Sequence, residues 1–271
     1  MDFKEKQFDG SYEISEVEIQ NEEEKFRGLL YFPPEKFSKP YPLIFYFHGF
    51  PQLSTLKEIV TDHHYLLEMG YALLVFNFRG YRFSEGKISI KSQVSDSYKI
   101  LEFADLMSKK NYFNIKKFNI IAHDFGAYIA LILTSKSEMI NKLLLVNPIL
   151  DLKKHIHNED FIKSLNYINR FLPGNVKGIE DPKHFIEMTK YELKNGEFQI
   201  DKFIANLKIN HLKLIVGEED KITPITEVER IMKRANIKPS IFIVSSMDHD
   251  CLEETAYNTL HTEIKSFFEK S

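Results

Sequence analysis

The sequence predicts an α/β protein built on an open, mostly parallel, doubly wound sheet. Short apolar runs recur along the 271-residue chain, and helix-length amphipathic stretches separate them. The central runs, such as residues 73–76 and 143–146, are apolar on both faces, as strands are when helices cover both sides of a parallel sheet. A chain of this length fits one large domain with a modest insertion.

The expected elements alternate as such a sheet requires. Eight strands are expected, at residues 11–20, 26–32, 41–47, 71–78, 118–123, 142–147, 212–217 and 240–245. The first two alternate polar and apolar residues, which suits an antiparallel start, and the charged segment at residues 21–25 joins them as a hairpin turn. Helices are expected at residues 55–69, 91–109, 128–133, 224–234 and 252–268.

One interval breaks this alternation. Residues 151–210 contain no convincing buried strand, but they carry helical patterns at 160–171 and 182–193, punctuated by Pro173-Gly174 and Asn195-Gly196. We interpret the interval as a helical cap inserted between strands six and seven, over the strand ends where such sheets place their sites. The core would then comprise residues 1–150 and 211–271. The alternative is a helical decoration that touches no ligand.

Composition excludes several classes of function. The 36 basic and 39 acidic residues give a net charge of −3, which makes nucleic acid and anionic membrane poor partners. The single cysteine, Cys251, excludes an internal disulfide framework and fits a reducing compartment. With no secretory pattern in the first residues and no apolar run of about 18, a cytoplasmic protein is expected. The sequence does not indicate its oligomeric state.

Two short segments contain histidine side chains of the kind that bind metal ions. Neither Asp62-His63-His64 nor the pair His155 and His157 has a convincing third ligand, so no metal is expected. No other cofactor is expected either. Cys251 lies outside any turn that would expose a nucleophile, and an inert thiol is the simplest interpretation.

The segment with the clearest chemistry is Ala122-His123-Asp124-Phe125-Gly126-Ala127. It follows an expected strand and precedes an expected helix, and its small flanking residues allow a sharp turn that holds the central side chain at the edge of the sheet. This is the nucleophile-elbow pattern with two changes. Ala122 replaces the first glycine, and Asp124 replaces the usual serine. A carboxylate needs no base to act as a nucleophile at pH 7.

Around this elbow the chain resembles the α/β-hydrolase superfamily over nearly its whole length. The resemblance implies an oxyanion loop after the third strand, a fourth-strand segment, a triad acid after the seventh strand and a triad histidine after the eighth. The residues that match these features are His48-Gly49-Phe50-Pro51, Arg79-Gly80-Tyr81 with Ser84, Gly217-Glu218-Glu219-Asp220, and Met247-Asp248-His249. The order nucleophile, acid, histidine is the one this fold uses.

Within the superfamily, the aspartate at the elbow is similar to the branch that contains epoxide hydrolases and haloalkane dehalogenases. Residues 78–86 also look like the feruloyl-esterase and acyl-peptidase branch, which uses serine. Dehalogenases hold the halide with tryptophan, commonly the residue after the nucleophile. That residue is Phe125 here, and the chain has no tryptophan. The resemblance therefore implies a small-molecule substrate and favours an epoxide over a haloalkane.

The resemblance implies a role for each site residue. Asp124 would form an ester with the substrate, and His249 would activate the water that hydrolyses it. Asp220 would orient the histidine, and the backbone N–H groups of Phe50 and Phe125 would form the oxyanion hole.

Other assignments stay open. Epoxide hydrolases protonate the leaving oxygen with tyrosines of the cap, and Tyr167 and Tyr191 lie in the inserted interval. Asp151 is a rival triad acid, although a helix N-cap is the simpler interpretation. Two other functions remain: an esterase or acyl hydrolase in which Asp124 replaces serine, and a non-catalytic binding protein on this fold.

Overall fold

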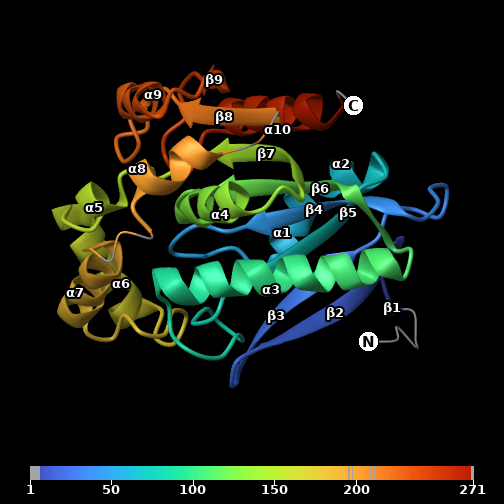
Figure 1. The fold of residues 1–271 in the computed structure, drawn as a ribbon, viewed down its shortest axis with the longest axis horizontal. Coiled ribbons are helices and arrows are strands. Elements are labelled where there is room, and N and C mark those ends of the chain that lie inside the picture. Colours follow the sequence, from blue (N-terminus) through green and yellow to red (C-terminus); the bar gives the residue numbers. More distant parts are fainter. Residues whose placement is uncertain (1–6, 195, 197, 208, 210, 270–271) are drawn as a thin grey trace.

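A single nine-stranded sheet runs through the part of the molecule that is described (Figure 1). The structure is a computed structural model, and it describes residues 7–194, 196, 198–207, 209 and 211–269. The strands are β1 (Gln7–Asp9), β2 (Tyr12–Asn21), β3 (Glu24–Tyr31), β4 (Tyr41–Phe47), β5 (Ala72–Asn77), β6 (Phe113–His123), β7 (Ile140–Val146), β8 (His211–Gly217) and β9 (Ser240–Val244). Their order is β1-β2-β3-β5-β4-β6-β7-β8-β9.

The pairing confirms the expected fold class. β1, β2, β3 and β5 pair antiparallel, and every pair from β5 across to β9 is parallel. The predicted count of eight strands is one too few, because the three-residue β1 is too short to show a pattern. β6 also starts at Phe113, five residues early. Phe113 pairs with Tyr41 and Phe118 with Leu43, so the charged segment between them is an irregularity within the strand.

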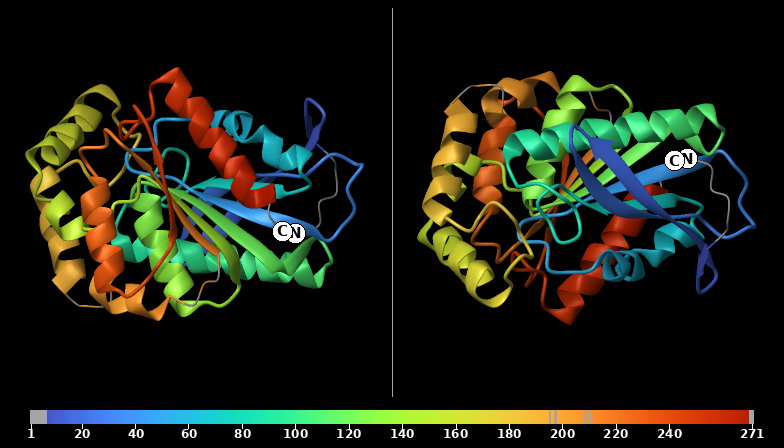
Figure 2. Two further views of the ribbon diagram at one scale, coloured as in Figure 1. Left: turned by 90° about the horizontal axis from the view of Figure 1, so that it is seen from above. Right: turned by 90° about the horizontal axis from the view of Figure 1, so that it is seen from below.

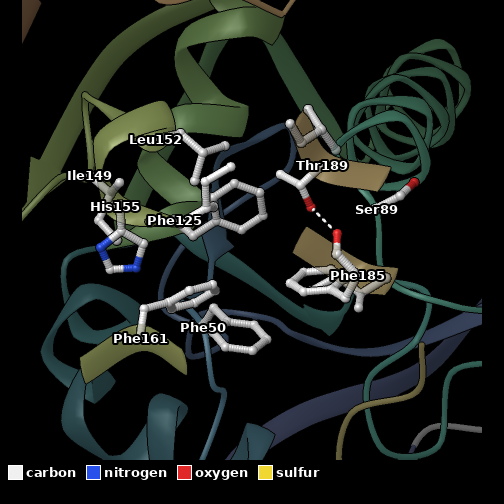
Figure 3. Close-up of a pocket in the computed structure, with 12 residues that line it drawn as sticks. Phe50, Ser89, Phe125, Ile149, Leu152, His155, Phe161, Phe185 and Thr189 are labelled. Atoms are coloured by element: carbon white, nitrogen blue, oxygen red, sulfur yellow. Dashed lines mark hydrogen bonds between the residues drawn. The ribbon is translucent and has the colours of Figure 1, made fainter. Parts of the chain in front are cut away.

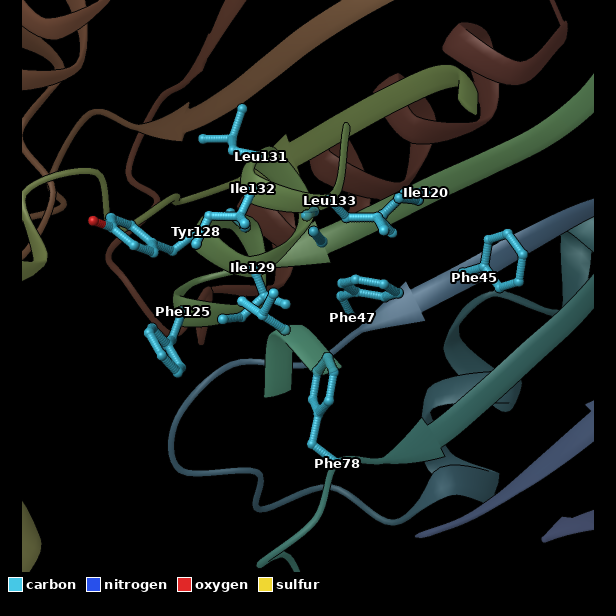
Figure 4. Packing of buried hydrophobic residues seen from close by; sticks show 14 of the residues in the cluster. Phe45, Phe47, Phe78, Ile120, Phe125, Tyr128, Ile129, Leu131, Ile132 and Leu133 are labelled. Atoms are coloured by element: carbon cyan, nitrogen blue, oxygen red, sulfur yellow. The ribbon is translucent and has the colours of Figure 1, made fainter. Parts of the chain in front are cut away.

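Helices cover both faces of the sheet, as expected for buried parallel strands (Figure 2). Neighbouring residues of β4 point to opposite faces. Phe45 and Phe47 pack in the core with α3 (Ile90–Lys109) and α4 (Phe125–Lys136), whereas Ile44 packs in the core with α1 (Leu56–Asp62), α2 (His64–Glu68) and α10 (Glu254–Glu269). On the α4 side, Phe47 and Phe78 lie against Ile129 (Figure 4).

The face of the sheet opposite α3 and α4 is covered by α1, α2 and α10. The expected helix at residues 55–69 is observed as two, α1 (Leu56–Asp62) and α2 (His64–Glu68), separated at His63. Thr55 begins α1 with a capping box, in which its side chain accepts from the Glu58 N–H and the Glu58 carboxylate accepts from the Thr55 N–H. The C-terminal helix, α10 (Glu254–Glu269), packs beside them.

Between β7 and β8 the described secondary-structure elements are helices, apart from an isolated antiparallel bridge between Val176 and Tyr81. The helices are α5 (Leu152–His155), α6 (Glu159–Phe171), α7 (Pro182–Lys194), α8 (Ile200–Phe203) and a 3₁₀ turn (Ile204–Asn206). The predicted patterns correspond to α6 and α7, whereas the two four-residue helices were too short to predict. Asn195 and Asn210 lie outside the described residues. α5, α6 and α7 lie beyond the carboxyl ends of the parallel strands (Figure 1).

Specific hydrogen bonds hold this segment to the rest of the chain. The Glu192 carboxylate of α7 accepts from the backbone N–H groups of Ile90 and Lys91, which satisfies two donors at the start of α3. The Tyr128 hydroxyl of α4 donates to the backbone oxygen of Phe198 at 2.5 Å. The remaining helix, α9 (Ile225–Arg234), follows β8. Among the described residues, no helix has the length and apolar character needed to cross a bilayer.

Candidate active site

The turn between β6 and α4 holds Asp124 in a backbone conformation that is rare for a residue with a side chain. Its φ is 52° and its ψ is −120°, a geometry that costs about 1–3 kcal/mol. Three backbone hydrogen bonds support it: the Asp124 N–H donates to Val146 O at 3.1 Å, and the Asp124 carbonyl accepts from Ala127 and Ile149, each at 3.2 Å. The predicted elbow is therefore present, and it raises the carboxylate above the strand ends.

Close backbone approach explains the glycine that follows Phe125. A Cβ atom on Gly126 would lie 2.3 Å from the carbonyl oxygen of Phe47 and 2.5 Å from that of His48. Both atoms belong to the backbone at the end of β4, so they cannot move away as a side chain could. Only glycine lets α4 start this close to the segment that carries Phe50.

The structure brings Asp124, His249 and Asp220 together from three strand ends. His249 Nδ1 lies 2.8 Å from Asp220 Oδ2, and His249 Nε2 lies 3.2 Å from Asp124 Oδ1. Asp220 is held in turn by the N–H groups of Ile222 and Thr223, both at 2.8 Å from its Oδ1. The imidazole is thus fixed between two buried carboxylates.

The predicted oxyanion donors lie beside the same carboxylate. The Phe50 N–H donates to Asp124 Oδ2 at 2.5 Å. Phe125 is the first residue of α4, where backbone N–H groups have no partner within the helix. The two oxygens of Asp124 therefore differ: Oδ2 faces the Phe50 donor, and Oδ1 faces His249.

The charges of the three side chains support one another. Burial alone would raise the pKa of Asp124, but the hydrogen bond and charge of His249 outweigh it and hold this pKa below its usual value. The pKa of Asp220 is lowered by the same balance. Burial lowers the pKa of His249, but its hydrogen bonds to the two carboxylates outweigh this and raise it to about 10. At neutral pH the free protein therefore holds an imidazolium between two carboxylates.

This arrangement predicts how His249 titrates. In wild-type protein the imidazole should stay protonated up to about pH 10. Because that pKa lies above the ordinary value of 6.5, its contribution to stability is fully present below pH 6.5 and is lost as the pH rises through 10. Nitrogen-15 NMR of the ring should show this titration, and Asp124→Asn should lower its midpoint. A wild-type midpoint near 6.5 would contradict the assigned charge state.

With this geometry in view, comparison with known proteins identifies the family. A sequence model of the α/β hydrolase fold matches residues 42–184, just over half of the chain. The chain belongs to the α/β-hydrolase fold family. No curated protein sequence matches it significantly.

Solved structures share the fold at low sequence identity. A dipeptidyl aminopeptidase IV candidate from Bacteroides ovatus has a TM-score of 0.70 and 17% identity, over 96% of this chain and 36% of that one. An esterase from Pyrococcus furiosus has a TM-score of 0.69 and 19% identity, over 97% of this chain and 94% of that one. A puromycin-hydrolysing peptidase from Mycobacterium tuberculosis has a TM-score of 0.70 and 13% identity, over 95% of this chain and 39% of that one. This α/β-hydrolase chain thus spans well under half of either peptidase, and these similarities show the fold alone.

Two cavities of this α/β-hydrolase lie beside the elbow. The apolar pocket, between Phe50, Phe125, Phe161 and Phe185, has a volume of only about 20 Å³ (Figure 3). The ring of Phe50 lies 5.6 Å from that of Phe161 and 6.3 Å from that of Phe185, centre to centre. This space holds about one water molecule, so no organic substrate fits it as it stands.

The second cavity, here called the chamber, has a volume of about 430 Å³. It is bounded by the loops at residues 49–54 and 249–252 and by side chains of α1 and α10. Both Asp124 and His249 line the chamber, and neither lines the apolar pocket. Its volume falls in the range of small-molecule sites.

The structure does not place the two predicted cap tyrosines at the site. Tyr167 and Tyr191 are 58% and 66% exposed, on the outer faces of α6 and α7, and neither lines the apolar pocket or the chamber. Tyr167 instead packs on Phe171. The helical pattern placed these residues in the right segment, but it could not show which face of each helix points inward. Neither is positioned to protonate a substrate on Asp124.

The structure shows the surroundings of the other candidate residues. Asp151 is the N-cap of α5, and its side chain accepts from the Lys154 N–H at 3.0 Å. Burial raises the pKa of the Cys251 thiol to about 11, which disfavours the reactive thiolate. Within the described part of the chain, no three His, Cys, Asp or Glu side chains are grouped so that they could hold a metal.

Sequence reasoning missed Asn147, which connects the loops that carry Asp220 and His249. Its Nδ2 donates to the backbone oxygens of Asp248 and His249 at 3.0 and 2.9 Å, and its Oδ1 accepts from the Gly217 N–H at 2.9 Å. Asn147 is fully buried and has a φ of 41°. The sequence does carry one signal for this residue: an asparagine that directly follows an apolar strand and precedes a proline.

Proposed function

We propose that this protein is a cofactor-independent hydrolase that forms a covalent ester on Asp124, which a water activated by His249 then hydrolyses. The observation that carries the proposal is the pair of contacts to the Asp124 carboxylate. Oδ2 accepts from the Phe50 N–H at 2.5 Å, and Oδ1 lies 3.2 Å from His249 Nε2. An epoxide is the substrate class that this chemistry fits best, because a free carboxylate can open it without prior deprotonation.

In the first step, Asp124 Oδ1 attacks a ring carbon of the epoxide. A C–O bond forms to Oδ1 while the ring C–O bond breaks, and the ring oxygen leaves as an alkoxide. Because the two cap tyrosines face solvent, we assign the proton donor to the His249 imidazolium. The proton passes from Nε2 to the alkoxide, and His249 becomes neutral. Its pKa of about 10 in the free protein keeps that proton available at neutral pH.

In the second step, neutral His249 takes a proton from water, and the hydroxide attacks the Asp124 carboxyl carbon. Negative charge develops on Oδ2, where the Phe50 N–H already donates, and the Phe125 N–H at the start of α4 is the second donor. Collapse of the intermediate breaks the Cγ–Oδ1 bond, and the proton of the newly added hydroxyl passes to the departing diol oxygen. The cycle ends with Asp124 as a carboxylate and His249 as an imidazolium held by Asp220.

The loss of charge on Asp124 makes this sequence of steps consistent. The imidazolium cannot act as a base while both neighbouring carboxylates are charged. Formation of the ester neutralises Asp124, so the pKa of His249 falls when a base is first needed. We further propose that residues 151–210 act as a cap over the apolar side of the elbow, where Phe161 and Phe185 of α6 and α7 close the apolar pocket over Phe50 and exclude bulk water from it.

The two alternatives account for less of this geometry. If Asp124 attacked an ordinary carboxylic ester, the intermediate would be a mixed anhydride, which is much less stable than an alkyl ester. A binding protein has no need for a strained backbone that holds a carboxylate between an N–H donor and an imidazole, and such strain concentrates at functional sites.

The proposal is tested by the intact mass of His249→Ala after incubation with epoxides, haloalkanes and activated esters. His249→Ala lacks both the proton donor of the first step and the base of the second, so an ester on Asp124 should form slowly with an epoxide, as water protonates the alkoxide, and should then persist. Peptide mapping should place the added mass on Asp124, and His249→Ala with Asp124→Asn should remain unmodified. An adduct elsewhere, or adducts only with activated esters, would overturn the proposal.

A further inference from the structure

The chamber and the apolar pocket are separate cavities, and Phe50 lines both of them. The floor of the chamber comes from strand residues such as Ile121 and Val146, and its outer wall comes from Leu260 and Ile264 of α10. A substrate that reacts with Asp124 must occupy space that Asp124 borders. Since this carboxylate lines the chamber and not the apolar pocket, the lining of the chamber decides which molecules reach it.

The charged side chains of this lining are mostly acidic. Asp62, Asp124 and Asp250 line the chamber together with the imidazolium of His249, and no lysine or arginine is among its lining residues. Asp62 is oriented by Tyr257, whose hydroxyl donates to its Oδ1 at 2.7 Å. Three carboxylates against one cation give an excess of negative charge in a partly enclosed space, where electrostatic interactions are stronger than in water.

Three more histidines line the chamber, and all are neutral at physiological pH. Burial lowers the pKa of His63, lowers that of His123 to about 4 and lowers that of His261 to about 3. They therefore add no positive charge to offset the carboxylates. Their rings lie among the aromatic side chains of Tyr46 and Tyr257, with His261 4.2 Å from Tyr257 and His63 5.2 Å from Tyr46, centre to centre.

His63 also presents a hydrogen-bond acceptor. Its Nδ1 lies 2.8 Å from the carbonyl oxygen of Ile59, so Nδ1 must carry the proton and donate. Nε2 is then an unprotonated acceptor, and the described residues supply it with no hydrogen-bond donor. His63 is only 6% exposed and its ring lines the chamber. An acceptor on a ring that lines the chamber can receive a hydrogen bond from a ligand that brings its own N–H or O–H donor.

We propose that the chamber is the substrate site and that it selects small molecules bearing an ammonium group over uncharged ones, and uncharged ones over carboxylates and phosphates. The ammonium would be attracted by Asp62 and the aromatic rings, and its N–H donors would reach His63. Combined with the proposed function, on which this inference rests, the substrate class is an amine-bearing epoxide. Anionic molecules would be disfavoured because His249 is the one cation among the residues that line the chamber. Arg82 contacts the loop at residues 49–54 through the backbone oxygens of Gln52 and Leu53, but it is not a lining residue.

The test compares benzylamine, benzyl alcohol and benzoate, which share a ring and differ in charge, by isothermal titration calorimetry at pH 7. Benzylamine should bind at least tenfold more tightly than benzyl alcohol, and benzoate should bind least. Asp62→Asn should weaken benzylamine about tenfold and leave benzyl alcohol unchanged. Asp105→Asn, on α3 and outside the chamber lining, is the matched control and should change neither. Benzoate binding as tightly as benzylamine, or indifference to Asp62→Asn, would overturn the inference.

A second measurement keeps the test valid if Asp62→Asn fails to fold. Cys251 is the single thiol of the chain and lines the chamber. Attaching a methylthio group to it in the folded protein should weaken benzylamine binding, and reduction should restore it; no change would place the binding elsewhere and overturn the inference. Because these titrations involve no reaction, benzylamine can bind as expected even if Asp124 never carries an adduct. That result would refute the proposed function and leave this inference standing.

Discussion

Replacing Asp124 with asparagine is expected to reduce turnover by roughly 10⁴-fold or more, the usual effect of removing a covalent nucleophile. The amide is nearly isosteric with the carboxylate, so it can still accept from the Phe50 N–H and keep the elbow in place. It cannot attack an epoxide as a carboxylate does. It also removes one of the two charges that hold the pKa of His249 near 10.

The matched control is Asp151→Asn. This carboxylate lies at the carboxyl end of the neighbouring strand β7 and caps α5, but it has no contact with His249. We expect Asp151→Asn to keep near-wild-type turnover, with at most a small loss of stability. Steady-state hydrolysis of the reactive epoxide measures both variants. Comparable activity in Asp124→Asn and wild type would refute the role assigned to Asp124.

Replacing Gly126 with alanine is expected to destabilise the protein by about 3 kcal/mol, the upper part of the range for overpacking a tight contact. In an ordinary helix the same change is stabilising by roughly 0.5–1 kcal/mol. Here the new Cβ would lie 2.3 and 2.5 Å from the backbone oxygens of Phe47 and His48. Relief requires α4 to shift, and the shift would carry Asp124 away from Phe50.

Urea unfolding measures this effect, and Gly174→Ala is the control. Gly174 has a φ of 78° and nothing within 4 Å of its added Cβ, so its change costs only backbone strain of about 1 kcal/mol. Gly126→Ala should be the more destabilised of the two and should also lose activity. Equal unfolding midpoints would show that the contact between α4 and the end of β4 is not as tight as described.

The fold could be predicted from the sequence because its signals are local and repeated. Runs apolar on both faces identify the parallel strands, and β4 shows why: Ile44 and Phe45 pack in the cores on opposite faces. The elbow could be predicted for the same reason, since the strand, the small residues and the helix are adjacent in the chain. The three-residue β1 carried too little pattern to be found.

The arrangement of the site is harder to predict from the sequence, because it depends on the orientation of side chains that are far apart along the chain. Tyr167 and Tyr191 share their helices with inward-facing residues, and only packing reveals that they face solvent. Asn147 acts through hydrogen bonds to backbone atoms about 70 and 100 residues away. The chamber likewise exists only where α1, α10 and two loops meet.

The most direct test of the central claim is a single turnover in water enriched in oxygen-18, with enzyme in excess over a reactive epoxide. If an ester forms on Asp124, the water oxygen enters the carboxyl group of that residue, because His249 directs the hydroxide at its carboxyl carbon. Mass spectrometry should then find the label in the peptide that contains Asp124 and none in the diol. Label in the diol after one turnover, with none on Asp124, would show that water attacks the substrate directly and would contradict the covalent mechanism.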